Sequence, residues 1–139
     1  MAASRVTRAD PALTGDRIVL TIPRDEGFEE VAQLVLAGVA ARLNLTYESL
    51  DDLGTGLATL LERRSAGGDL TIELVVGDDT ITAAIGPFRS AKLLGELERR
   101  GDGVGLRRVL ETVVDSFGAV EREDGQWVEL QKRVRKTEA

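Results

Sequence analysis

The residues with the clearest chemical potential are three glycines at alternate positions, Gly101, Gly103 and Gly105, directly before an apolar-periodic segment. Glycine lets the backbone turn tightly and come close to a ligand, because it has no Cβ. The free N–H groups at the start of a helix beside such a run can bind a phosphate. Glycine is also the default residue of tight turns. The run therefore indicates either an anion-binding loop or a plain turn.

The composition excludes several kinds of chemistry. The chain has no cysteine and no histidine, which excludes disulfides, thiolate chemistry, zinc sites and histidine-based catalytic triads. The formal net charge of −6 argues against a surface that makes many contacts with nucleic-acid phosphates. No apolar run approaches the length of a membrane span, and the first residues lack the apolar core of a secretion signal. We therefore expect a cytoplasmic protein without a direct nucleic-acid or membrane partner.

The length of 139 residues and the ordinary globular composition predict one domain with a single core. Residues 1–15 are small and polar without periodicity, which indicates a mobile leader. The domain is expected to span residues 16–134. Residues 135–139 form a short basic tail, which we expect to be solvated.

The periodicity of apolar residues predicts the order strand, helix, helix, strand, strand, short helix, long helix, strand, strand. Helices gathered on one face of a mixed, mainly antiparallel sheet make an α+β two-layer sandwich. The expected strands lie at residues 17–22, 70–76, 80–85, 119–122 and 126–132. The expected helices begin after the cap residues Asp25, Thr46 and Ser90 and at residue 104 or 105, the last one extending to Phe117.

Two of the helices have predicted buried faces. The first helix has an apolar stripe of Phe28, Val31, Val35, Val39 and Leu43. The second helix has a stripe of leucines at Leu50, Leu53, Leu57, Leu60 and Leu61. Gly54 and Gly56 interrupt the second helix, which indicates either close packing against a neighbour or a face that once lined a ligand pocket.

The chain resembles the anti-sigma-factor serine kinases of the GHKL superfamily, whose Bergerat fold also occurs in the ATPase domains of histidine kinases. The resemblance runs from about residue 17 to residue 134. The motifs that carry it, in order, are Leu20-Thr21-Ile22-Pro23, Leu50-Asp51-Asp52-Leu53, Gly103-Val104-Gly105-Leu106 and Val113-Val114-Asp115. It implies a histidine-kinase-like ATPase fold, ATP with Mg²⁺ as the cofactor, and a protein partner such as a sigma factor or an anti-sigma antagonist. It also implies a homodimer through residues 17–23 and the start of the first helix.

The resemblance also implies where the chemistry of the family would lie. The family has a glutamate base on its second helix and, four residues on, an asparagine that holds Mg²⁺, so both lie on one helix face. Thr59 and Arg63 stand at these positions. A threonine cannot act as that base at neutral pH, and an arginine does not ligate a cation. The aspartate that accepts a hydrogen bond from adenine corresponds to Ala84, two residues before Gly86.

The resemblance therefore indicates a degenerate member, with no catalytic residue and no metal site. Its nucleotide pocket would consist of Arg63, Ala84, Gly86, Gly103, Gly105 and Leu106. We expect a regulatory protein that acts by binding a protein partner and needs no cofactor, although the family itself uses ATP with Mg²⁺.

Two alternatives stay open. One is an active ATP-dependent serine kinase and anti-sigma factor, in which Glu62 would be the base. The other is a pseudo-ATPase that binds another small anionic ligand, with Arg63 neutralising a phosphate directly. Residues 88–100 occupy the position of the lid of the family, and Leu93, Leu94 and Leu97 either close over a ligand or fill the vacated pocket.

Overall fold

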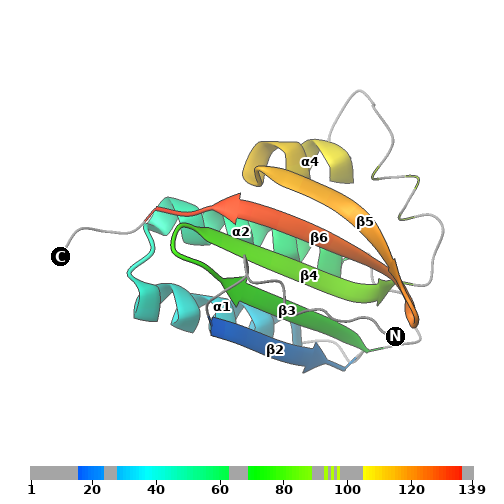
Figure 1. Cartoon of the computed structure of the whole chain (residues 1–139), viewed down its shortest axis with the longest axis horizontal. Helices are drawn as coiled ribbons and strands as arrows, with labels where there is room; N and C mark the ends of the chain where they lie inside the picture. Colours follow the sequence, from blue (N-terminus) through cyan, green and yellow to red (C-terminus); the bar gives the residue numbers. More distant parts are fainter. Residues whose placement is uncertain are drawn as a thin grey trace.

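The computed structural model describes residues 16–23, 28–62, 69–88, 93, 95, 97 and 105–135. The predicted leader at residues 1–15, the cap Asp25 and residues 136–139 of the tail lie outside this part of the chain. The elements, in chain order, are β2 (Asp16–Ile22), α1 (Phe28–Leu43), α2 (Tyr47–Leu61), β3 (Leu70–Val76), β4 (Thr80–Phe88), α4 (Leu106–Val113), β5 (Ser116–Arg122) and β6 (Gly125–Arg133) (Figure 1).

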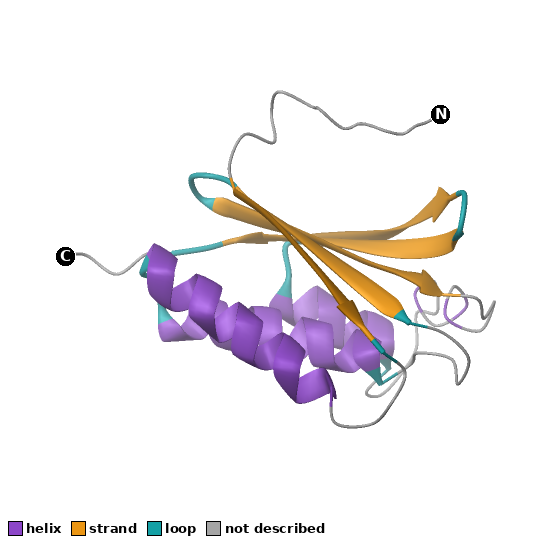
Figure 2. Ribbon diagram, turned by 90° about the horizontal axis from the view of Figure 1, so that it is seen from below, coloured by secondary structure: helices purple, strands orange, loops and turns teal. Residues whose placement is uncertain are grey.

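The described strands form one sheet in the order β2-β3-β4-β6-β5, and every neighbouring pair is antiparallel. The three described helices all pack against the same face of this sheet (Figure 2). The predicted α+β two-layer sandwich is confirmed. Cross-strand pairs fix the register: Val19 of β2 lies opposite Glu73 of β3, and Ala84 of β4 lies opposite Glu129 of β6.

The core lies between the helix layer and the sheet. In β3, the alternation predicted from the sequence is confirmed, because its buried residues alternate with half-buried ones. The helix α2 lies between α1 and α4 (Figure 1) and covers the middle of the sheet. Its predicted leucine face is confirmed for Leu53, Leu57, Leu60 and Leu61, which are buried, while Leu50 is half-buried against the same core. Burying one such leucine contributes about 1.5–3 kcal/mol.

The buried face of α1 differs from the predicted stripe. The structure buries Ala32, Leu36 and Ala40, one position away from Val31, Val35 and Val39. Of the predicted stripe, Val39 and Leu43 are partly buried against the core. Val31 is exposed. The helix is apolar around most of its circumference, so periodicity does not single out one face. The alanines let α1 approach its neighbours closely.

The helix α4 ends earlier than predicted. It stops at Val113, Val114 is already extended, and Phe117 belongs to β5 instead of the helix. Phe117 lies opposite Leu130 of β6 and packs against the core from the sheet. An apolar residue at helical spacing can thus belong to the strand that follows and pack against the core from there. Val113 and Val114 are β-branched, which favours the change to extended backbone.

The glycines of α2 allow close packing. A Cβ on Gly56 would lie 3.4 Å from Leu130 of β6 and 3.6 Å from Val113 of α4. A Cβ on Gly54 would lie 2.9 Å from the side-chain oxygen of Gln33 in α1, whose amide donates to the Gly54 carbonyl at 3.1 Å. These contacts support the packing interpretation of both glycines.

The segment directly after β6 is hydrogen-bonded to the start of α2. The buried hydroxyl of Ser49 accepts from the backbone N–H of Arg135 at 3.0 Å, and the N–H of Thr46 donates to the Arg135 carbonyl at 2.8 Å. Lys132 pairs with Asp52 at 2.9 Å. Thr46 is the N-cap that the sequence predicts, because its side chain accepts from the N–H of Ser49.

The contact between α2 and the sheet predicts the effect of truncating one leucine. Leu60→Ala should lower the free energy of unfolding by about 2–5 kcal/mol, because it leaves a cavity under a fully buried position. Tyr47→Ala, at an exposed position in the same helix, should change it by no more than about 0.5 kcal/mol. Urea unfolding of both variants checks this, and equal losses would contradict the packing described.

Candidate functional site

The position of the catalytic base in the resembling family lies near the end of α2. The Thr59 side chain is half-buried there, and its hydroxyl donates to the carbonyl of Thr55 at 2.7 Å. This bond holds the hydroxyl against its own helix. Arg63, four residues on, lies outside the described residues. Glu62, the alternative base, is exposed at the C-cap of α2.

Ala84, at the position expected to bind adenine, lies on the face of the sheet opposite α2. Its neighbours Ala83 and Ile85 belong to the core on the helix side of β4. Because side chains alternate across a strand, Ala84 lies on the opposite face, which the described helices leave uncovered. There its cross-strand neighbours are Glu73 and Glu129. The structure therefore places Thr59 and Ala84 on different sides of the sheet.

Position 86 requires glycine, because an aromatic ring packs closely against its backbone. A Cβ at this position would lie 2.6 Å from the indole ring of Trp127, far inside contact distance. The ring is buried, and its Nε1 donates to Asp124 Oδ1 at 2.7 Å. Gly86 and Trp127 thus form a packed structural contact at the end of β4.

The glycine run meets α4 at Gly105, its N-cap. Gly105 is extended (φ −96°), has no side-chain cap bond, and would have nothing within 4 Å of an added Cβ. Leu106, the next residue, is completely buried in the core. Gly103 and Gly101 lie outside the described residues. Neither packing nor backbone strain requires glycine at position 105, so the two interpretations of the run stay open.

The described residues of the expected lid segment pack into the core. Leu93 and Leu97 are buried in the main core cluster, and Arg107 of α4 donates to the Leu97 carbonyl at 2.8 Å. Leu94 lies outside the described residues. The two described leucines thus agree with the interpretation that this segment fills space.

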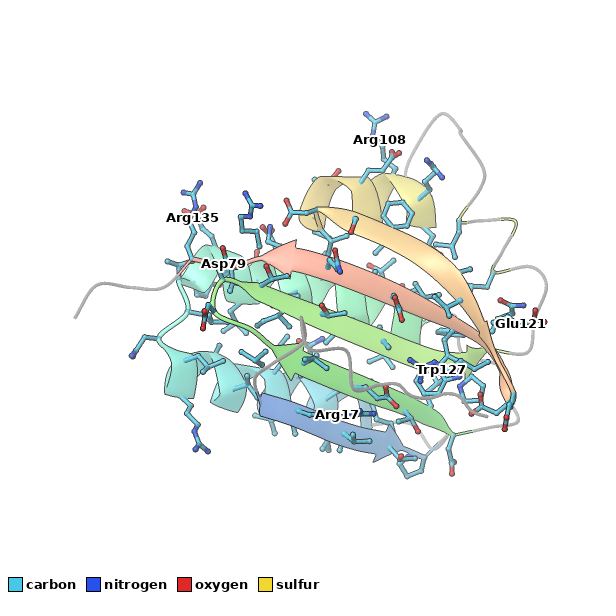
Figure 3. The ribbon with its side chains drawn as sticks, in the orientation of Figure 1. Arg17, Asp79, Arg108, Glu121, Trp127 and Arg135 are labelled. Atoms are coloured by element: carbon cyan, nitrogen blue, oxygen red, sulfur yellow. The ribbon has the colours of Figure 1, made fainter. Side chains whose placement is uncertain are left out.

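A charged cluster lies on the face of the sheet opposite the described helices, and the sequence does not predict it. The Arg122 guanidinium lies 3.9 Å from the centroid of the Trp127 ring and 3.3 Å from both carboxylate oxygens of Glu73. Glu73 also pairs with Arg17 at 3.5 Å, and Arg122 approaches Glu129 at 4.0 Å. Arg17 and Trp127 are labelled in Figure 3. The carboxylates of this cluster are matched by arginines, so it is a stabilising network and not a set of free acids or bases.

The described residues at the expected nucleotide positions do not fit ATP and Mg²⁺. Thr59, Ala84, Gly86, Gly105 and Leu106 supply no carboxylate, and Ala84 faces away from the helices. In the part of the chain that the structure describes, no group of three or more acidic side chains could hold a metal ion. No described helix is long and apolar enough to cross a membrane.

Comparisons with known proteins give the fold. Neither the protein-family models nor the curated proteins give a match to this chain. Among solved structures, it is similar to the crystal structure of the RsbU and RsbW domains of Rv1364c from Mycobacterium tuberculosis, with a TM-score of 0.63 and 12% identity. The fold is that of the GHKL-like ATPases. The match covers 88% of this chain and 35% of the other, so this chain spans about a third of its neighbour.

The contact between Gly86 and Trp127 generates a prediction. Gly86→Ala should lower the free energy of unfolding by about 1–3 kcal/mol, because the added Cβ forces the ring to move. It should also shift the emission of Trp127, the single tryptophan of the chain. Gly118→Ala in β5 is the matched control, since its added Cβ would meet nothing within 4 Å. An unchanged spectrum and stability for Gly86→Ala would contradict the contact.

Proposed function

We propose that this chain is a regulatory protein of the GHKL-like ATPase superfamily that acts by binding a protein partner without phosphorylating it. The partner would be a sigma factor or an antagonist of an anti-sigma factor. The family resemblance also implies a homodimer of this chain. The observation that carries the proposal is the fold shared over 88% of the chain with a structure that includes an RsbW domain. The family resemblance of the sequence motifs supports the same assignment independently.

The side chains at the nucleotide positions support a mode of action without catalysis. An ATP site needs an acceptor for the adenine amino group and oxygen ligands for Mg²⁺. Ala84 offers a methyl group, and the Thr59 hydroxyl is bonded to its own helix. Losing several such polar contacts weakens binding by orders of magnitude. The proposal therefore includes no step in which ATP is bound or cleaved.

The proposal predicts the outcome of a nucleotide titration. Mg-ATP should give no saturable heat in calorimetry, no rise in melting temperature and no transfer of labelled phosphate to a co-purified partner. Gly105→Trp, which would block a phosphate at the start of α4, should behave like the parent chain. Stabilisation by ATP that Gly105→Trp abolishes would favour the active kinase. Stabilisation by phosphate or another anion alone would favour the pseudo-ATPase that binds another small anionic ligand.

Partner binding has its own test. The chain should form a complex with a sigma factor or an anti-sigma antagonist from the same genome, and the affinity should be the same with ATP present or removed enzymatically. An affinity that depends on ATP would contradict the proposed mode of action. Failure to bind any member of either class would contradict the proposed function itself.

A further inference from the structure

The strand β5 forms one edge of the sheet. Among the described strands it pairs with β6 alone, so the backbone N–H and C=O groups along its other edge have no strand partner in the described part of the chain. An edge of this kind can accept an extended segment of another protein, which adds a strand to the sheet. Lysine, proline and bulges are the features that commonly protect an edge against such pairing.

The middle of β5 lacks these protective features. The strand contains no lysine and no proline, and its register with β6 is continuous from Ser116 to Arg122. At the opposite edge of the sheet, Pro23 directly follows β2. The two charged residues of β5 lie at its C-terminal end, so the centre of the strand is uncharged. Its exposed residues are Ser116, Gly118, Ala119 and Glu121.

Gly118 lies at the centre of this edge. A Cβ at this position would meet nothing within 4 Å, so packing among the described residues does not require glycine there. Glycine inside a strand weakens it, and it often marks a place where another backbone approaches closely. An aromatic side chain on a neighbouring strand compensates for such a glycine by packing over it. An added strand has room for that side chain over Gly118.

Two exposed charges flank the position of an added strand. The helix α4 lies next to β5, because the Arg107 guanidinium is 5.6 Å from the centroid of the Phe117 ring. The neighbouring Arg108 is exposed and forms no ion pair among the described residues, and it points away from the sheet in Figure 3. Glu121 is exposed on the same face of β5 as Phe117, since residues four apart in a strand share a face. An acidic group near Arg108 and a basic group near Glu121 would be favoured.

We propose that the free edge of β5 binds an extended segment of the protein partner, antiparallel to β5 like every other described pair in the sheet. The segment carries an aromatic residue opposite Gly118, an acidic residue opposite Ala119 and a basic residue opposite Glu121. It lies about 4.8 Å from β5, the usual spacing of paired strands. The backbone hydrogen bonds provide the affinity, and these three side chains provide the selectivity.

This inference deepens the proposed function, on which it rests for the class of the partner, and it names the part of the chain that the partner contacts. The free edge of β5 is distinct from the surface that the family resemblance implies for a homodimer, which consists of residues 17–23 and the start of the first helix. The strands β2 and β5 lie at opposite edges of the sheet (Figure 1).

Hydrogen exchange with a synthetic peptide tests the pairing. The peptide contains the order Lys-Val-Asp-Tyr and is added to the full chain at ten times its dissociation constant. It should slow exchange of the β5 amides at the free edge by about tenfold, because exchange then requires the peptide to dissociate. Exchange in β2, the matched control strand, should not change. A peptide with the same sequence, N-methylated at the amides that would face β5, should give no protection, because these amides no longer donate.

Charge exchange tests the selectivity. Arg108→Glu should weaken binding of the peptide by about threefold or more, because it turns an attraction at an exposed site into a repulsion. Replacing the aspartate of the peptide by lysine should restore binding to this variant. Arg42→Glu is the matched control, since Arg42 is an exposed arginine of α1, on the other side of α2 from α4 (Figure 1). It should leave the affinity unchanged.

Several results would overturn the inference: no protection by the peptide, protection of β2 in place of β5, equal binding of the N-methylated peptide, or no effect of Arg108→Glu. A sigma factor or anti-sigma antagonist that forms a complex and leaves exchange in β5 unchanged would also overturn it, while the proposed function would stand. Protection of β5 by the peptide without a complex with either class would instead contradict the proposed function and support the edge as a binding site.

Discussion

The fold depends on the contact between the buried face of α2 and the middle of the sheet. Four leucines of this helix are buried there, and Gly56 lets the helix backbone come close to Leu130 of β6. The same helix contacts α1 through Gly54 and Gln33, and α4 through Val113. Its first turn is tied to the end of β6 by Ser49 and Arg135. One helix therefore positions both flanking helices and the end of a central strand.

The parts of the fold that the sequence predicts are those in which polarity changes with a clear period. The strand β3 alternates cleanly, and α2 has leucines on one face and acidic residues on the other, so both were predicted correctly. The buried face of α1 was predicted only in part, for Val39 and Leu43, because apolar residues such as Val31, Leu34 and Leu36 lie on different sides of this helix. The end of α4 was missed because Phe117 fits the spacing of a helix but belongs to β5, from which it is partly buried against the core.

The candidate site was harder to predict, because it depends on which face of a strand each side chain occupies and on the register of the sheet. Ala83 and Ala84 are both small and apolar, so the sequence does not tell which of them points to the helices. The cluster of Arg122, Glu73 and Trp127 joins strands that are far apart in the chain, and only the register of the sheet brings them together. The sequence predicts Gly86 as a ligand position, and the structure adds a packing reason for glycine there, the ring of Trp127. Arg63 and Gly103 stay predictions.

The position of β6 has a consequence for how the chain reaches its native state during synthesis. This strand lies between β4 and β5, and it is the last strand to be translated among those described. Until residues 125–133 leave the ribosome, β4 exposes a free edge and β5 has nothing to pair with. Such edges readily associate with other chains. The hydrophobic core therefore closes late, and a nascent chain stalled before β6 is a natural client for chaperones.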